Sequence, residues 1–211
     1  MKTIVFSDVH GNLPALEAML RHAGPADRYV CLGDVVNYGP WSDECVQLLE
    51  TLPNCDKIVG NHDEAFLKGS YDGTHPVAQA FFRHCYPRFT QRAALTRYSP
   101  SVEVGAFRAQ HTLGGQYIYP TTPLSLDGNY LVGPSPPQFK REDGGWVLYN
   151  AGSVGQNRGL INVINYLVCG PGPDDVRMAG FTYDVEPVIA EMRRRDYPSE
   201  CLAYYEGKPR A

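Results

Sequence analysis

The sequence has no long apolar run, no closely spaced cysteine pair and no excess of basic residues. No apolar stretch reaches the roughly 18 residues that a transmembrane helix needs, so we expect no membrane span. The apolar run Ile4–Phe6 is too short for the core of a signal peptide. The six cysteines are scattered, which disfavours a cysteine-built zinc site and indicates reduced thiols in a cytoplasmic protein. With 19 basic and 23 acidic residues, the net charge of −4 makes long nucleic acid an unexpected substrate.

Short strands and helices alternate in the first part of the chain. At 211 residues the chain is long enough for one sizeable core, so we expect a single domain over 1–211. The opening β–α–β–α–β order predicts parallel strands joined by crossover helices. After it we expect a helical region broken at Pro87, then five short strand-like runs and a last helix. The expected strands are 2–7, 28–32, 57–59, 101–111, 129–132, 146–149, 162–169 and 177–183, and the expected helices are 13–22, 45–52, 74–97 and 185–195.

Three strands in the first half of the chain end on polar residues of similar kinds. The strings are FSDVHGN (6–12), CLGDVVNYGP (31–40) and IVGNHDE (58–64), and a later strand leads into His111. Loops at the carboxyl ends of neighbouring strands converge on one crevice of an open α/β sheet. We therefore expect one cluster of polar side chains, made of Asp8, His10, Asp34, Asn61, His62 and His111.

These side chains carry the donor atoms of a divalent-metal site. Carboxylate oxygen, imidazole nitrogen and amide oxygen suit Mn, Fe or Zn. Asp34 is a natural bridge between two ions because a carboxylate has two oxygens to share. Two ions about 3.5–4 Å apart can activate a water and hold a phosphoryl group in line. Taken singly, each residue also has a structural explanation as a helix cap, a turn residue or a buried histidine, but the repetition at three strand ends favours the metal site.

The three strings resemble the calcineurin-like metallophosphoesterase superfamily, and most closely its compact bacterial and archaeal branch of small, YfcE-like phosphodiesterases. The family pattern is Asp-x-His, Gly-Asp, Gly-Asn-His-Asp/Glu, a later His and then Gly-His-x-His. DVHGN, GDVVNYGP and GNHDE match its first three blocks. NAGSVGQNR (150–158) resembles the stretch that follows the metal site in this branch, with Ala151 and Asn157 in place of two prolines. The resemblance covers residues 1–158.

The resemblance implies an α/β fold, a four-layer αββα sandwich of two mixed β-sheets flanked by helices. It implies that His62 lies beside the phosphate as proton donor to the leaving oxygen or as a transition-state stabiliser, and that Asp63 orients it. It also implies metal ligands: the first ion is held by Asp8 and His10, the second by Asn61 and His111, and both by the bridging Asp34.

The sequence departs from the family at the Gly-His-x-His block. Gly133-Pro134-Ser135-Pro136 stands in its place, so each ion loses one histidine, and proline has no side-chain donor atom. The backbone carbonyls of this stretch are possible metal ligands. Ser135, Gln138 and Tyr130 are candidates for indirect help through water.

Two functions therefore stay open. The first is a divalent-metal-dependent phosphoesterase, expected to be a phosphodiesterase. It would hydrolyse a small phosphodiester or phosphomonoester with a metal-activated water, at a weak or mononuclear site that holds one or two ions, with Mn or Fe favoured over Zn. The second is a catalytically impaired binding or interaction module on the same fold. Asn37 and Arg158 are candidate contacts to a substrate phosphate or base, with turn formation and an ion pair as their structural alternatives.

Overall fold

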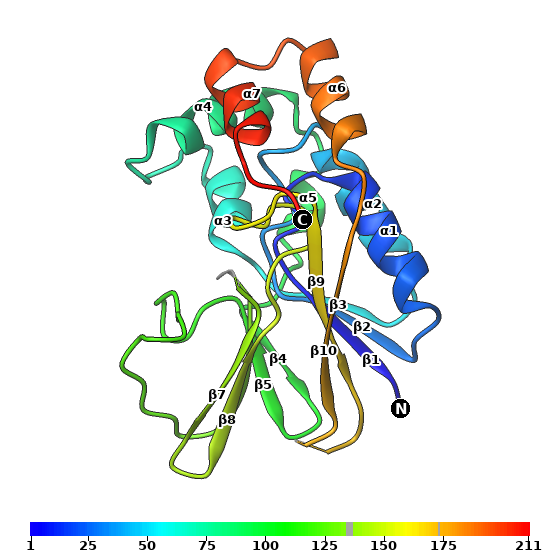
Figure 1. Cartoon of the computed structure of the whole chain (residues 1–211), viewed down its shortest axis with the longest axis vertical. Coiled ribbons are helices and arrows are strands. Elements are labelled where there is room, and N and C mark those ends of the chain that lie inside the picture. The colour runs from blue at the N-terminus through cyan, green and yellow to red at the C-terminus, as the bar shows by residue number, and fades with distance from the viewer. Residues whose placement is uncertain (134–136, 173) are drawn as a thin grey trace.

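The computed structural model describes residues 1–133, 137–172 and 174–211, and its strands form two five-stranded sheets (Figure 1). The first sheet has the order β10-β9-β1-β2-β3. Its three N-terminal strands run parallel, as the opening pattern predicted, and β9 is antiparallel to both β1 and β10. The strands are β1 (Thr3–Phe6), β2 (Arg28–Cys31), β3 (Cys55–Lys57), β9 (Val163–Cys169) and β10 (Val176–Thr182).

The second sheet has the order β4-β5-β6-β8-β7. Its three central strands are parallel, and each edge strand is antiparallel to its neighbour, so this sheet is mixed as well. Its strands are β4 (Ser101–Val104), β5 (Phe107–Gln110), β6 (Asn129–Val132), β7 (Phe139–Asp143) and β8 (Trp146–Asn150).

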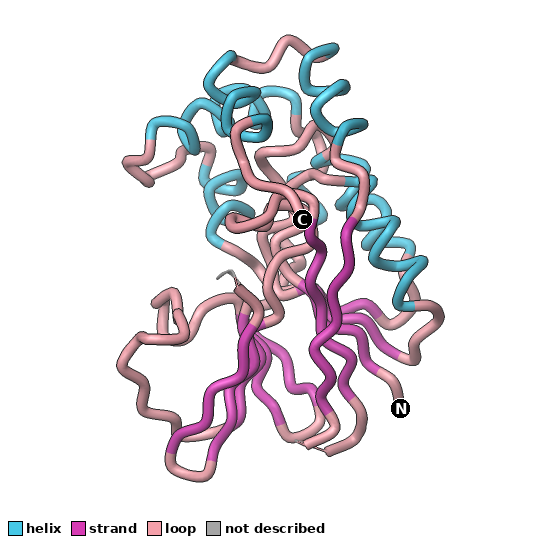
Figure 2. Tube along the Cα trace, in the orientation of Figure 1, coloured by secondary structure: helices cyan, strands magenta, loops and turns pink. Residues whose placement is uncertain are grey.

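Helices cover the face of the first sheet that points away from the second sheet, and Figure 2 shows them gathered apart from most of the strands. The N-terminal helix begins where Asn12 accepts a hydrogen bond from the backbone N–H of Ala15, and its buried residues Leu16 and Met19 pack toward the sheet. Among the described residues, none of the helices combines the length and apolar character needed to cross a membrane. The helices are α1 (Leu13–Ala23), α2 (Ser42–Thr51), α3 (Asn61–Lys68), α4 (Pro76–Cys85), α5 (Arg92–Leu95), α6 (Glu186–Arg194) and α7 (Ser199–Glu206), with a 3₁₀ turn η1 (Tyr86–Arg88).

The two sheets pack face to face over a shared apolar layer. Val5 and Val30 from the first sheet belong to the same buried cluster as Phe107 and Leu131 from the second. Alternate residues of these strands point the other way, as the two-residue period of a strand requires, and Ile4 packs with the helices. The predicted fold of two mixed sheets flanked by helices is confirmed.

The outer face of the second sheet is covered mainly by an irregular segment, 112–128. Ile118 and Leu126 from this segment pack with Tyr130, Val132 and Leu148 in a third buried cluster. The fourth layer of the sandwich is thus formed here by a long loop that buries its own apolar side chains.

Some element boundaries differ from those expected. The strand predicted over 101–111 is a hairpin, because Gly105 adopts a positive φ of 58° and turns β4 back into β5. The helical region 74–97 is divided into α4, η1 and α5 around Pro87. The elements α3, β7 and α7 were not predicted, and α3 begins inside the GNHDE string that looked like a strand-end loop.

Candidate metal and phosphoester site

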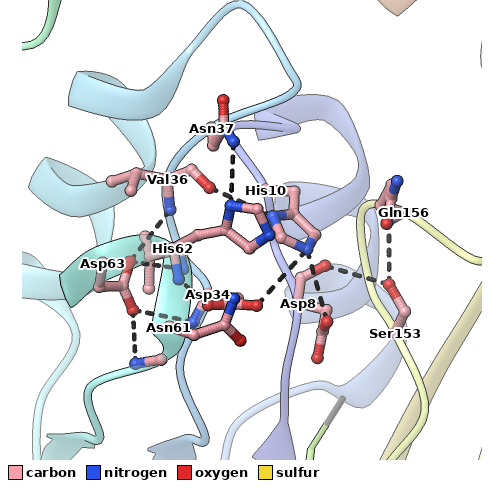
Figure 3. A network of polar contacts seen from close by, with 12 residues as sticks. Asp8, His10, Asp34, Val36, Asn37, Asn61, His62, Asp63, Ser153 and Gln156 are labelled. Atoms are coloured by element: carbon pink, nitrogen blue, oxygen red, sulfur yellow. Dashed lines mark hydrogen bonds and ion pairs between the residues drawn. The ribbon is translucent and has the colours of Figure 1, made fainter. Parts of the chain in front are cut away.

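The expected polar cluster forms at the carboxyl ends of the parallel strands (Figure 3). Asp8 and His10 follow β1, Asp34 follows β2, and Asn61 begins α3 just after β3. His111 comes from the other sheet, directly after β5. All six residues of the predicted cluster are buried or nearly so, which means that a ligand there is shielded from bulk water.

Asp34 lies at the centre of the cluster. Its Oδ2 is 3.8 Å from Nε2 of His10 and 3.4 Å from Nε2 of His111. On one side, Oδ1 of Asp8 is 3.4 Å from Nε2 of His10, and on the other, Oδ1 of Asn61 is 3.1 Å from Nε2 of His111. One carboxylate thus lies between two sets of donor atoms, as expected for a residue that bridges two ions.

The tautomers of the two histidines suit metal binding. Nδ1 of His10 lies 3.2 Å from the carbonyl oxygen of Val36, and Nδ1 of His111 lies 2.8 Å from that of Leu32. A carbonyl only accepts, so each Nδ1 carries a hydrogen, and in the neutral form of each ring the Nε2 lone pair faces the cluster. Such contacts to the non-ligating nitrogen are the usual way of fixing a metal-binding histidine.

A divalent cation fits this set of atoms. With neutral imidazoles, the Nε2 atoms and the facing oxygens are all acceptors, and a cation satisfies them together. Ligand atoms bound at about 2.0–2.2 Å to one ion lie about 3.0–3.6 Å apart, which is close to the separations found here. Within the described residues, Oδ2 of Asp8 is buried without a hydrogen-bond partner. Neither Asp8 nor Asp34 has a lysine or arginine partner in that part of the chain, so the buried negative charge calls for a cation.

The titration of the cluster reflects this excess of negative charge. Burial lowers the pKa of His111, but the Asp34 carboxylate outweighs it and raises the pKa to about 9. Burial raises the pKa of Asp34, yet the three histidines around it hold the pKa well below its usual range. The carboxylates thus create a strong attraction for positive charge at this point.

His62 also lies in this cluster, and its ring has a defined orientation. A ligand atom of His62 lies within 4.8 Å of ligand atoms of His10 and Asp34. The amide nitrogen of Asn37 donates to Nδ1 of His62 over 2.9 Å, so the ring proton is on Nε2. Tyr71 stacks on the imidazole with 5.2 Å between ring centroids. Burial lowers the pKa of His62 to about 4, and the ring is therefore neutral at pH 7.

Asp63 does not make the orienting contact that the resemblance implied. Its carboxylate accepts hydrogen bonds from the backbone N–H groups of Asp34, Val35, Val36 and Gly60, and Asn37 is the residue that contacts His62. Asp63 thus joins the loops after β2 and β3. Asn37 is fully buried and its side-chain nitrogen contacts His62, while its expected contact to substrate stays a prediction.

The backbone around the site is strained. Among the described non-glycine residues, seven have a positive φ, and five of them belong to this region: Asp8, His10, Asp34, Asn37 and Tyr38. Each such residue costs on the order of 1–3 kcal/mol unless its surroundings hold it. Gly60 is needed for a different reason, because a Cβ there would lie 2.2 Å from Oδ1 of Asp34. The two loops approach each other too closely for a side chain.

The remaining predicted residues lie around the cluster or outside the described residues. Arg158 lines a cavity next to His62, described below. Gly133, which follows β6, donates its N–H to the carbonyl of His111 over 2.9 Å, so the end of β6 reaches the site. The substituted positions 134–136 lie outside the described residues. The Gln138 amide nitrogen donates to backbone carbonyls of the first sheet and of Ala151, and the Tyr130 hydroxyl donates to Asp127.

Two mixed sheets with this donor set at their strand ends define the metallophosphoesterase class. The chain belongs to the calcineurin-like phosphoesterase family, whose sequence model matches residues 1–131, and the predicted family is confirmed. Sequence analysis did not identify Tyr71, Tyr117, Tyr204 and Lys208, which also line the cavity at His62. These residues are far apart in the chain and belong to no motif, so nothing in the sequence pointed to them.

Comparison with known proteins agrees with this assignment. A metallophosphoesterase from Sphaerobacter thermophilus superposes with a TM-score of 0.80 at 25% identity, over 98% of each chain. The hypothetical protein PH1004 from Pyrococcus horikoshii has the same fold, with a TM-score of 0.77 and 14% identity over 97% of each chain. The uncharacterized protein MJ0912 from Methanocaldococcus jannaschii is 47% identical over 66 residues, which are 30% of this chain and 26% of that protein. The match thus spans about a quarter of the curated relative.

Proposed function

We propose that this protein is a divalent-metal-dependent phosphodiesterase that acts on a small phosphate ester. The position of the Asp34 carboxylate between the Nε2 atoms of His10 and His111 is the observation that carries this proposal. Asp8 and His10 would hold one ion, and Asn61 and His111 a second, with Mn or Fe favoured and Zn as the alternative. A bound ion supplies Lewis acidity that activates water and offsets charge on the phosphoryl group.

The other groups at the site support the same reaction. Nε2–H of His62 is available to donate a hydrogen bond to the leaving oxygen of the ester and so offset its developing charge, since Nδ1 is engaged by Asn37. Asn37 and the stacked Tyr71 hold the ring in place. Buried surroundings strengthen these electrostatic contacts. We treat 1–211 as one domain because both sheets contribute to the inter-sheet cluster. The six cysteines are free, and the cytoplasmic location expected from them stays a prediction.

A metal titration tests the proposal against the alternative of an impaired binding module. Metal-free protein is titrated with Mn²⁺ while hydrolysis of bis(p-nitrophenyl) phosphate is followed. We expect turnover that rises with Mn²⁺ and saturates. No turnover at millimolar Mn²⁺, together with no metal on the purified protein, would leave the binding module as the better function.

His62→Gln should lower kcat for this ester by about 100-fold and leave Mn²⁺ affinity within about threefold, because the ring donates to the leaving group and is not needed to hold an ion. Glutamine keeps a donor of similar size, so the buried position stays filled. Steady-state kinetics and calorimetric Mn²⁺ binding on the same preparations check both halves. A loss of Mn²⁺ binding equal to the loss of rate would make His62 a metal ligand instead.

Restoring the two missing histidines provides a further prediction. The double variant Pro134→His and Pro136→His should raise Mn²⁺ affinity by about 10–100-fold, the size of effect that changes around metal ligands commonly have. Calorimetric titration of wild type, each single variant and the double variant measures it. Unchanged affinity in the double variant would mean that these positions do not face the ions. Pro137→His, one residue further along, is the matched control and should have no effect.

A further inference from the structure

A cavity of about 340 Å³ adjoins His62, within the size range of small-ligand sites. Four tyrosines line it, from four separate segments: Tyr38 after β2, Tyr71 between α3 and α4, Tyr117 in 112–128, and Tyr204 on α7. Two cationic side chains, Arg158 and Lys208, complete the polar part of the wall. The C-terminal part of the chain thus contributes to a cavity that begins at the metal cluster.

The tyrosine rings are held in place. Tyr204 accepts a hydrogen bond from the side-chain amide of Gln156 over 2.5 Å, which joins α7 to the loop after β8. Its ring lies 6.1 Å from that of Tyr38, measured between centroids. The hydroxyl of Tyr117 donates to Oδ1 of Asn61 over 2.8 Å. Rigid aromatic side chains that border a cavity are suited to stacking on a flat ring, as nucleobases do on protein aromatics.

The two cations are not neutralised by carboxylates. In the described ranges, neither Arg158 nor Lys208 forms an ion pair, whereas the nearby Arg210 pairs with Glu186 over 2.6 Å. Nζ of Lys208 donates to the carbonyl oxygen of Arg158 over 2.9 Å and lies 4.5 Å from the centroid of Tyr204. Burial and the neighbouring Arg158 lower the pKa of Lys208 to about 8. Two adjacent cations without an ion-pair partner among the described residues favour an anionic ligand between or beside them.

We propose that the cavity lined by Tyr204, Arg158 and Lys208 binds a nucleotide-type substrate, with the base against the tyrosines and a second phosphate at the two cations. This inference rests on the proposed phosphodiesterase function and names its substrate class. The cleaved phosphate lies at the metal cluster next to His62, and the rest of the substrate occupies the cavity. The C-terminal helix and the residues after it therefore determine which esters are accepted.

Equilibrium binding to metal-free protein tests the subsite without relying on activity. The probes are ADP, adenosine and inorganic pyrophosphate, titrated calorimetrically in the presence of EDTA. We expect ADP to bind more tightly than either fragment. Lys208→Gln should weaken ADP and pyrophosphate by about tenfold and leave adenosine unchanged, while Tyr204→Leu should weaken ADP and adenosine and leave pyrophosphate unchanged. Lys140→Gln, on β7 away from the cavity, is the matched control and should match wild type.

Kinetics separate this inference from the proposed function. With Mn²⁺, Tyr204→Leu should lower kcat/KM for the p-nitrophenyl ester of thymidine 5′-phosphate by about tenfold, whereas Lys208→Gln should leave it unchanged because this ester has no second phosphate. Both variants should leave kcat/KM for methyl p-nitrophenyl phosphate unchanged. The unchanged reaction also verifies that each variant is folded. If wild type hydrolyses the methyl ester but ADP affinity is the same in all four proteins, the subsite is overturned and the phosphodiesterase function stands. ADP binding with the expected variant pattern but no hydrolysis of any ester would overturn the function and support a nucleotide-binding site.

Discussion

Asp34→Asn is expected to lower phosphodiester hydrolysis by about 10³-fold or more. The substitution removes the negative charge that lies 3.4–3.8 Å from two imidazole nitrogens. A ligand that bridges two ions would contribute to holding both, each ion would supply several kcal/mol of transition-state stabilisation, and about 1.4 kcal/mol corresponds to tenfold in rate. The fold should persist, because an asparagine Oδ1 can still accept the N–H of His62 that Asp34 Oδ1 accepts over 2.8 Å.

The measurement combines kinetics, metal content and thermal unfolding. We expect purified Asp34→Asn to carry less metal than wild type and to need far more Mn²⁺ for any turnover. Asp72→Asn is the matched control, since that carboxylate is exposed and only pairs with Lys68; its rate and metal content should equal those of wild type. Hydrolysis within tenfold of wild type, at equal Mn²⁺ content, would contradict the bridging role of Asp34.

Gly155→Ala is expected to reduce the free energy of unfolding by about 3 kcal/mol and to weaken metal binding as well. A Cβ on Gly155 would lie 1.8 Å from the carbonyl oxygen of Val9 and 2.8 Å from Cβ of Asn12. The backbone cannot move away easily. The N–H of Gly155 donates to the carbonyl of Asp8 over 2.8 Å, and its own carbonyl accepts from the side chain of Asn12 over 2.9 Å. The added methyl group therefore displaces the loop that carries Asp8.

Urea unfolding and Mn²⁺ titration of Gly155→Ala measure the two effects. For a chain of this size, the expected loss corresponds to a Tm lower by about 6–12 °C. Gly159→Ala in the same loop is the control, because its Cβ would meet only Oδ1 of Asn157 at an ordinary 3.5 Å. It should change stability by less than about 0.5 kcal/mol. Equal stability of the two variants would show that the loop yields to the methyl group and does not fix the position of Asp8.

The fold and the ligand cluster could be predicted from the sequence because their signals are local. A strand followed by Ser-Asp, Gly-Asp or Gly-Asn is recognisable within a few residues, and parallel strands must end at the same edge of a sheet. Asp8, Asp34 and Asn61 were therefore found without knowledge of the packing. The hairpin at Gly105 and helix α3 were missed because one glycine conformation and a charged helix leave weak periodic patterns.

The contacts around His62 could not be predicted in the same way. Asn37 and Asp63 are both polar and both close to the motif, and only the path of the loop after β2 decides which of them contacts the ring. The family resemblance favoured Asp63. The backbone N–H groups of that loop occupy its carboxylate instead, so Asn37 contacts the ring.

The sequence by itself determined the fold class, the family and the chemical nature of the site, because residue type and spacing along the chain are enough to specify them. Only the tertiary structure decided which groups face one another across the site. Tyr38, Tyr71, Tyr117 and Tyr204 share a cavity with Lys208 because α7 and the residues after it pack back against the loops that follow β2 and β8. Such contacts join positions that lie far apart in the chain, and a pattern within one sequence carries no signal at that distance.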